Sequence, residues 1–251
     1  MYELACAYRY VPAEVDALVR WWRTHASSAA QQAAVLELAA GPAEHALEFA
    51  RRGFSATALD ISPAMCARAR EKAEQAGLEL AVVEADMRDF SVPGSFGLVT
   101  TMLNSTCHLM VLDDFVSHLR SVAAHTAGGG LYVMELAHPA DYLGRAPRTA
   151  TRWQTDLDGT RVRVSWGGPS DAIDPVTQVT MEHVSITVRG PKAARTLTGV
   201  VPNRFWTATE VDAAIRLAGG FTIAGCYGDF DSGVTLVSPG AWRMIMVLRR
   251  E

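Results

Sequence analysis

Three acidic residues, Glu37, Asp60 and Asp86, lie at or just beyond the ends of three predicted strands. In an open parallel sheet, ligands bind at the carboxyl ends of the strands, near the point where the strand order reverses. A carboxylate there can accept hydrogen bonds from hydroxyl and amino groups, and it attracts a cation. The spacing therefore predicts a binding site for a polar or positively charged ligand along one edge of a sheet.

The loop after the first of these strands reads Glu37-Leu-Ala-Ala-Gly-Pro-Ala-Glu-His45. A dinucleotide site would use Gly-x-Gly-x-x-Gly here, so that a pyrophosphate can touch the start of the next helix. Gly41 is present, but Ala43 and Ala46 occupy the next two glycine positions, and the two glutamates of the loop would repel phosphate. An acidic loop suits a cation instead. S-adenosylmethionine carries an α-ammonium and a sulfonium group and has no phosphate.

The other two carboxylates fit the same cofactor. Asp60 lies 19 residues after Gly41, where a carboxylate can accept hydrogen bonds from both ribose hydroxyls. Asp86 can accept from the exocyclic amine of an adenine, and the thioether of Met87 can pack on the ring. A solvated loop end would explain any one of these acids, but acids after three successive strands favour a ligand site.

The elements that must position these residues follow from the hydrophobic pattern. Apolar runs of strand length alternate with amphipathic helical spacing, and Gly and Pro residues separate them. This alternation indicates a parallel sheet with right-handed crossovers and helices on both faces. The predicted strands are 33–38, 55–61, 78–83, 96–102 and 131–136, and the helices between them begin at Pro42, Ser62 and Asp113.

The pattern changes to a period of two between residues 149 and 201. Val162, Val164 and Trp166 alternate with polar residues, and Asp158-Gly159 is typical of a hairpin turn. The segment is therefore predicted to be an antiparallel insertion of three or four strands.

A capping box at Thr207-Ala-Thr-Glu210 predicts a further helix, which two strands at 221–230 and 242–248 follow. The insertion is short and has core elements on both sides, so we expect one domain rather than two. The predicted organisation is a single domain over 1–251, with an N-terminal lid helix within 1–30 and an antiparallel β insertion, 145–203, over the substrate site.

At these motifs the chain resembles the class I S-adenosylmethionine-dependent methyltransferases of the small-molecule type. The resemblance rests on residues 35–45, 58–65 and 84–90, and on the entry to the fifth strand at 129–133. It implies an α/β fold with a Rossmann-like sheet of seven strands in the order 3-2-1-4-5-7-6, in which the last strand is antiparallel. The predicted insertion then follows strand five.

The resemblance also implies which residues hold the cofactor. This chain departs from the family where the first loop usually carries glycine, at Ala39 and Ala43, and the change at Ala43 is expected to affect cofactor affinity more than the fold. The expected cofactor contacts are Glu37, Ala39, Gly41, Pro42, Asp60, Ile61, Met65, Asp86, Met87, Leu103 and Asn104.

Methyl transfer depends chiefly on aligning a nucleophile with the S–CH₃ bond, and it needs a base only if the nucleophile arrives protonated. His108 follows the fourth strand, beside the expected position of the methyl group, and an ordinary imidazole pKa of about 6.5 suits a general base. Aromatic side chains near the N-terminus could hold a cation by cation–π attraction, or could only pack their helix onto the sheet. The expected substrate contacts are Tyr8, Tyr10, Trp22, His108, His138 and Arg152.

Composition and motifs argue against several classes of protein. The net charge is −4 and the arginines are scattered, so the basic stripe of a nucleic-acid-binding protein is missing. The longest uncharged stretch, 90–112, is interrupted by Pro and Gly residues, so we expect no membrane span. Four widely spaced cysteines predict free thiols in a reducing cytoplasm and no metal site. The expected partner is a small-molecule substrate, and homodimerisation is left open.

The leading hypothesis is methyl transfer to N or O of a small metabolite, which yields S-adenosylhomocysteine. A second hypothesis keeps the cofactor but has it donate its aminocarboxypropyl group or cyclise internally. A third is a nicotinamide-dependent oxidoreductase, which the acidic loop and Ala43 disfavour. A fourth is a non-catalytic S-adenosylmethionine-binding module.

Overall fold

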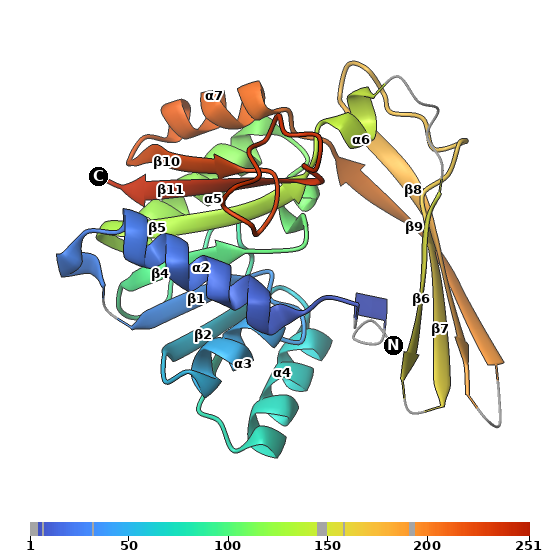
Figure 1. The fold of residues 1–251 in the computed structure, drawn as a ribbon, viewed down its shortest axis with the longest axis horizontal. Coiled ribbons are helices and arrows are strands. Elements are labelled where there is room, and N and C mark those ends of the chain that lie inside the picture. The colour runs from blue at the N-terminus through green and yellow to red at the C-terminus, as the bar shows by residue number, and fades with distance from the viewer. Residues whose placement is uncertain (1–4, 7, 32, 145–149, 158, 191–193) are drawn as a thin grey trace. The chain divides into compact units, whose positions relative to one another are not determined.

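The computed structural model describes the chain except for residues 1–4, 7, 32, 145–149, 158 and 191–193. The chain folds into two compact units, each described here by itself (Figure 1). The larger one, the sheet unit, comprises Val11–His138 and Trp206–Glu251. The smaller one, the insertion unit, comprises Met1–Tyr10 and Pro139–Phe205.

One seven-stranded sheet forms the centre of the sheet unit; its strands are β1 (Ala34–Leu38), β2 (Ser55–Asp60), β3 (Ala81–Glu84), β4 (Phe96–Thr101), β5 (Thr126–Ala137), β10 (Phe221–Tyr227) and β11 (Arg243–Arg250). Their spatial order is β3-β2-β1-β4-β5-β11-β10. β11 runs antiparallel to β5 and to β10, whereas the other neighbours are parallel. Since β10 and β11 are the sixth and seventh strands of this sheet, the predicted order is confirmed.

Helices cover both faces of this sheet (Figure 1). On one face lie α2 (Val11–His25), α3 (Glu44–Arg51) and α4 (Pro63–Ala76), which share a hydrophobic cluster with Val35 and Leu98. On the other face lie α5 (Leu112–His125) and α7 (Ala208–Ala218), which share a second cluster with Leu36 and Leu38. Successive residues of β1 thus face opposite helix layers, as the alternation of side chains along a strand requires.

Local signals set several helix ends. Ser62 accepts a hydrogen bond from the backbone of Met65 at the start of α4, and Gly77 ends that helix in the left-handed conformation, with φ 63°. The capping box at Thr207 and Glu210 is present at the start of α7. These signals were readable in the sequence because each depends on neighbouring residues only.

Several boundaries differ from the prediction; the third strand, predicted at 78–83, is β3 at Ala81–Glu84, and β10 ends at Tyr227 instead of at residue 230. α3 begins at Glu44 instead of Pro42, and β5 begins at Thr126, so the triple glycine lies inside the strand instead of before it. At Gly130, a Cβ atom would come within 2.9 Å of the Ala127 carbonyl oxygen and 3.0 Å of the Gly97 carbonyl oxygen. Glycine therefore permits a close approach of β5 to β4, which strand-length rules applied to apolar runs cannot detect.

The insertion unit contains a four-stranded antiparallel sheet, β6 (Thr151–Leu157), β7 (Thr160–Trp166), β8 (Val179–Arg189) and β9 (Ala194–Arg204), in sequential order. A short helix, α6 (Ala140–Leu143), precedes it. The predicted antiparallel insertion after strand five is thus confirmed. Of the predicted hairpin turn, Gly159 has a left-handed φ of 73°, and Asp158 lies outside the described residues.

Of the N-terminal segment, the described residues 5, 6 and 8–10 belong to the insertion unit. The indole Nε1 of Trp153 donates a hydrogen bond to the carbonyl oxygen of Ala5 at 2.6 Å, and the ring of Tyr8 meets Trp153 edge-on at 5.7 Å. The predicted lid segment 1–30 is therefore divided between the two units, because α2 packs on the sheet. A covering function for either part remains a prediction.

Candidate functional site

The loop after β1 takes a backbone that glycine normally supplies. Ala39, Gly41 and Ala43 all have left-handed φ angles, of 49°, 53° and 61°. An L-residue in this conformation costs roughly 1–2 kcal/mol, because its Cβ approaches the following carbonyl oxygen. The two alanines that depart from the family pattern thus keep the family's loop shape at the expense of local strain.

Asp60 ties the end of β2 to this loop. Its Oδ2 accepts a hydrogen bond from the backbone N–H of Gly41 at 2.7 Å, and its Oδ1 accepts from the N–H of Ser62 at 2.8 Å. Each carboxylate oxygen has a second lone pair and can accept again, so both can still receive ribose hydroxyls. The neighbouring side chain of Ile61 is 64% exposed, which leaves an apolar surface for a flat ring beside the carboxylate.

Glu37 lies behind the loop. Its carboxylate is buried, with Oε2 accepting from the N–H of Ala46 at 2.7 Å and Oε1 lying 3.2 Å from Nδ1 of His45. This position differs from the predicted direct contact with a cofactor ammonium, because side chains alternate along β1 and Glu37 faces the layer of α2 and α3. The second acid of the loop, Glu44, pairs with Lys72 of α4. Neither glutamate is therefore the open carboxylate that the sequence argument assumed.

The loop after β3 carries an ion pair that the sequence argument missed. Asp86 Oδ2 lies 2.6 Å from Nη2 of Arg88, and Arg88 also approaches Asp114 of α5 at 3.6 Å. The hydrogen bond from Arg88 lowers the pKa of Asp86, so the carboxylate stays ionised. Met87 is buried, and its carbonyl oxygen lies 2.8 Å from Nδ1 of His118 on α5. Asp86 and Met87 therefore lie on a fixed backbone.

The loop after β4 is held by β5. Leu103 and Asn104 are both left-handed, and the N–H of Leu103 donates to Oε2 of Glu135 at 2.9 Å. The amide oxygen of Asn104 accepts from the N–H of Ala137 at 2.9 Å. Oε1 of Glu135 lies 2.8 Å from Nε of Arg243 on β11. The amide oxygen of Asn104 is thus used within the protein. Its backbone is used as well, because its N–H donates to the carbonyl oxygen of Glu135 and its carbonyl oxygen accepts from the N–H of Cys107.

His108 ends the 3₁₀ turn η2 (Ser105–His108) that follows this loop. The residue is exposed, yet the protein atoms around its ring lower the pKa of the imidazole, and the Asp60 carboxylate opposes that shift. β2 and β4 both run parallel to β1, so Asp60 at the end of β2 and His108 after β4 lie at the same edge of the sheet. At neutral pH the imidazole is therefore uncharged and able to take up a proton.

The predicted substrate residues are dispersed. Trp22 is buried and meets Phe54 edge-on at 5.6 Å, just before the amino end of β2, so it packs α2 onto the sheet, and its substrate contact stays a prediction. Nε2 of His138 lies 2.9 Å from the carbonyl oxygen of Leu236 in the sheet unit. The other three, Tyr8, Tyr10 and Arg152, are exposed residues of the insertion unit. Of the predicted cofactor residues, Pro42 is buried and Met65 is half-buried at the start of α4.

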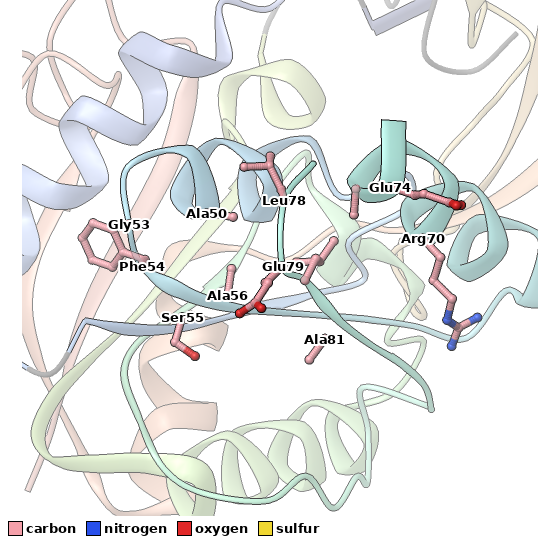
Figure 2. A pocket seen from close by; sticks show the side chains of 12 residues that line it. Ala50, Gly53, Phe54, Ser55, Ala56, Arg70, Glu74, Leu78, Glu79 and Ala81 are labelled. Carbon is pink, nitrogen blue, oxygen red and sulfur yellow. The ribbon is translucent and has the colours of Figure 1, made fainter. Parts of the chain in front are cut away.

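A hollow of about 890 Å³ opens at the edge of the sheet opposite to the carboxyl ends of the parallel strands (Figure 2). It lies at the amino ends of β2 and β3, where Ser55 and Ala81 line it together with Arg70 and Glu74 of α4. Asp60 and Asp86 lie at or beyond the opposite ends of these strands. This hollow is therefore separate from the residues predicted to hold a cofactor.

Residues 35–130 match the family model described as a methyltransferase domain. These residues include the loops after β1, β2, β3 and β4 that carry the candidate site. The domain belongs to the methyltransferases. The resemblance to class I S-adenosylmethionine-dependent methyltransferases is thereby confirmed for this part of the chain.

One curated relative is named as a methyltransferase of an amino sugar. The chain is 28% identical over 128 residues to a dTDP-3-amino-3,4,6-trideoxy-alpha-D-glucopyranose N,N-dimethyltransferase of Streptomyces venezuelae. The aligned segment covers 51% of this chain and 50% of that protein, so the match spans about half of the relative's length.

Solved structures share the fold over nearly the whole chain. An S-adenosylmethionine-dependent methyltransferase from Clostridium acetobutylicum superposes with a TM-score of 0.79 at 16% identity, covering 99% of this chain and 95% of that one. CalS10, an amino pentose methyltransferase from Micromonospora echinaspora, superposes with a TM-score of 0.75 at 22% identity, covering 98% and 96%. At such identities the likeness establishes the class I methyltransferase fold, with its insertion.

Proposed function

We propose that the protein is an S-adenosylmethionine-dependent methyltransferase that methylates a nitrogen atom of a small molecule, most specifically the amino group of a nucleotide-linked amino sugar. The observation that carries the proposal is the site at the carboxyl edge of a methyltransferase domain, where Asp60 and an uncharged His108 occupy one edge of the sheet. The amino-sugar assignment is supported by the curated relative, whose name describes an N,N-dimethyltransferase of an amino sugar.

The residues of the site fit this cofactor. Asp60 retains lone pairs for ribose hydroxyls, and exposed Ile61 offers an apolar surface for adenine. The ionised Asp86 can accept from the adenine amine if Arg88 shares it. When bound, S-adenosylmethionine supplies a methyl group on a positively charged sulfur. The left-handed loop from Ala39 to Ala43 is proposed to receive its amino-acid end.

The acceptor chemistry gives His108 its role. An aliphatic amine is largely protonated at neutral pH, and it must lose its proton before its lone pair can attack a methyl group. An uncharged imidazole can accept that proton, and the lowered pKa of His108 keeps it uncharged. A carboxylic acid is already ionised at neutral pH and needs no base, so a base at His108 fits an amine or a phenol better than an acid. The name of the curated relative favours the amine.

The insertion unit is proposed to recognise the substrate, since it carries Tyr8, Tyr10 and Arg152. Among the described residues, no helix is both long and apolar enough to cross a membrane. We propose a cytoplasmic location, because none of the four cysteines, all within the described residues, forms a disulfide. Homodimerisation remains a prediction for a measurement of mass in solution.

The function is tested by product analysis. The protein is incubated with S-adenosylmethionine and a panel of nucleotide-linked amino sugars, simple phenols and carboxylic acids, and the products are weighed by mass spectrometry. We expect one or two added methyl groups on an amino sugar, together with S-adenosylhomocysteine. Methylthioadenosine as the second product would instead show aminocarboxypropyl transfer or cyclisation. Cofactor binding without turnover of any acceptor would favour a binding module.

Replacement of Asp60 by alanine should weaken cofactor binding. Loss of the charge-assisted hydrogen bonds to ribose is worth about 1.5–3 kcal/mol, or roughly ten- to a hundred-fold in affinity. Calorimetric titration of wild type should give a micromolar affinity for S-adenosylhomocysteine and no measurable binding of NADH. Because Asp60 also holds Gly41 and Ser62, the variant should lose some thermal stability. Unchanged affinity would contradict the ribose assignment, and tighter binding of NADH would contradict the cofactor.

A further inference from the structure

A buried cluster of three charged side chains lies between α2, α3 and β1. His45, in the first turn of α3, is 2% exposed and lies between two carboxylates. Its Nε2 is 2.8 Å from Oε2 of Glu14 on α2, and its Nδ1 is 3.2 Å from Oε1 of Glu37 on β1. Glu14 and Glu37 are themselves buried, so the three groups interact with little screening by solvent.

The geometry fixes the protonation state of the imidazole. A neutral imidazole has one N–H, but here both ring nitrogens face carboxylate oxygens, which only accept. Both nitrogens therefore carry protons, and His45 is an imidazolium ion. The hydrogen bonds to Glu14 and Glu37 outweigh the effect of burial and raise the pKa of His45 to about 9. The charges that face it are Glu14 from α2 and Glu37 from β1, while Glu44 beside it in α3 pairs with Lys72.

The cluster brackets the cofactor loop. Glu37 precedes the loop and His45 follows it, and Glu37 also accepts from the N–H of Ala46. Both ends of the segment that holds the strained Ala39 and Ala43 are thereby joined. Glu14 extends the connection to the first turn of α2.

We propose that His45 is a positioning residue whose two ion pairs hold the cofactor loop in its binding shape and couple that shape to the docking of α2. This inference rests on the proposed cofactor site. The coupling is reciprocal: a ligand that orders the loop stabilises the docked helix, and loss of the Glu14 contact weakens ligand binding. α2 is therefore part of the cofactor site through the pairing of Glu14 with His45.

A matched pair of variants on α2 tests the proposal. Glu14→Gln removes a carboxylate that pairs with His45 in the first turn of α3. Asp16→Asn removes an exposed carboxylate that pairs with Arg52, at the other end of α3. Each substitution removes one negative charge and one ion pair between α2 and the region of α3. Only Glu14→Gln, however, removes a contact to His45, the residue proposed to hold the loop. Calorimetry with S-adenosylhomocysteine should show about ten-fold weaker binding for Glu14→Gln and less than about two-fold for Asp16→Asn. In kinetics, the KM for S-adenosylmethionine should rise while kcat changes little.

Methylthioadenosine separates positioning from general instability. It lacks the amino-acid end that the loop is proposed to hold, so its affinity should change less in Glu14→Gln than that of S-adenosylhomocysteine. An equal loss for both ligands, or equal effects of the two substitutions, would overturn the proposal.

Nitrogen-15 NMR of the imidazoles in wild type gives a readout that needs no variant. At pH 7.5 we expect both ring nitrogens of His45 to be protonated, and a neutral ring would overturn the proposal. If wild type binds no S-adenosylhomocysteine, the proposed function fails, while the NMR result still decides whether His45 is the charged bridge.

Discussion

Replacing His108 by alanine should lower turnover by roughly 10²–10⁴-fold and leave cofactor affinity nearly intact, as is typical for loss of a general base. The reason is the pKa of the imidazole, which its surroundings hold below the ordinary value. In wild type the rate should fall as the pH drops through this pKa, because a protonated imidazole cannot take a proton from the acceptor amine. The rate of the alanine variant should not show this fall at low pH. Steady-state kinetics from about pH 5 to pH 8 measure both effects.

His108→Gln is the matched variant, since an amide keeps much of the size of the ring but cannot accept a proton at neutral pH. Added imidazole should restore part of the activity to His108→Ala. If the glutamine variant keeps the wild-type rate and pH profile, His108 is not a base. A raised KM with unchanged kcat would assign it to substrate binding alone.

The sequence predicted the sheet because its signals are local. Ser62 and Gly77 delimit α4, the Thr207 capping box starts α7, and alternation of strands and helices implies the parallel order. The left-handed loop after β1 was harder to foresee, because alanines occupy two of its positions with positive φ. The residue types alone argue against this loop shape, and only the resemblance to the methyltransferases indicated it.

The candidate site was predicted less completely, since residue type says nothing of side-chain direction. Glu37 could have been placed correctly from the sequence: Leu36 and Leu38 face α5 and α7, so the residue between them must face the opposite layer. The pairing of Glu135 with Arg243, by contrast, joins two strands that only the folded sheet brings together. The role of Trp22 was also hard to read from the sequence, because an aromatic residue on an amphipathic helix can pack against the sheet, as Trp22 does against Phe54, or bind a ligand.

A second buried histidine should make the protein sensitive to acid. His118 on α5 lies 2.8 Å from the carbonyl oxygen of Met87 through Nδ1 and 2.7 Å from the hydroxyl of Tyr132 through Nε2. Nδ1 faces a carbonyl oxygen, which only accepts, so Nδ1 carries a proton. The hydroxyl of Tyr132 itself donates to Oγ1 of Thr101 at 2.9 Å, and burial disfavours a second proton on the ring. Burial lowers the pKa of His118 to about 4. It also raises the pKa of Tyr132, whose hydroxyl stays protonated.

The direction of the effect follows from the two pKa values. In the unfolded chain His118 titrates near about 6.5, so below that pH the unfolded state binds a proton that the folded state refuses. The stabilisation is complete above about pH 6.5 and is lost as the pH falls toward 4, for a total of about 3 kcal/mol. About 2 kcal/mol of this should be lost between pH 6.5 and pH 5. His45 acts in the opposite window, since its raised pKa gives stabilisation that is lost between about pH 6.5 and 9.

Denaturant unfolding at several pH values measures this dependence, with His118→Gln as the test and His183→Gln, an exposed histidine of the insertion unit, as the control. The His118 variant should be less stable at pH 7, because it loses contacts to Met87 and Tyr132, but its free energy of unfolding should fall less on acidification. The His183 variant should keep more of the wild-type slope. A wild-type slope in the His118 variant, or an NMR titration of His118 in wild type near pH 6.5, would show that the ring is not held neutral.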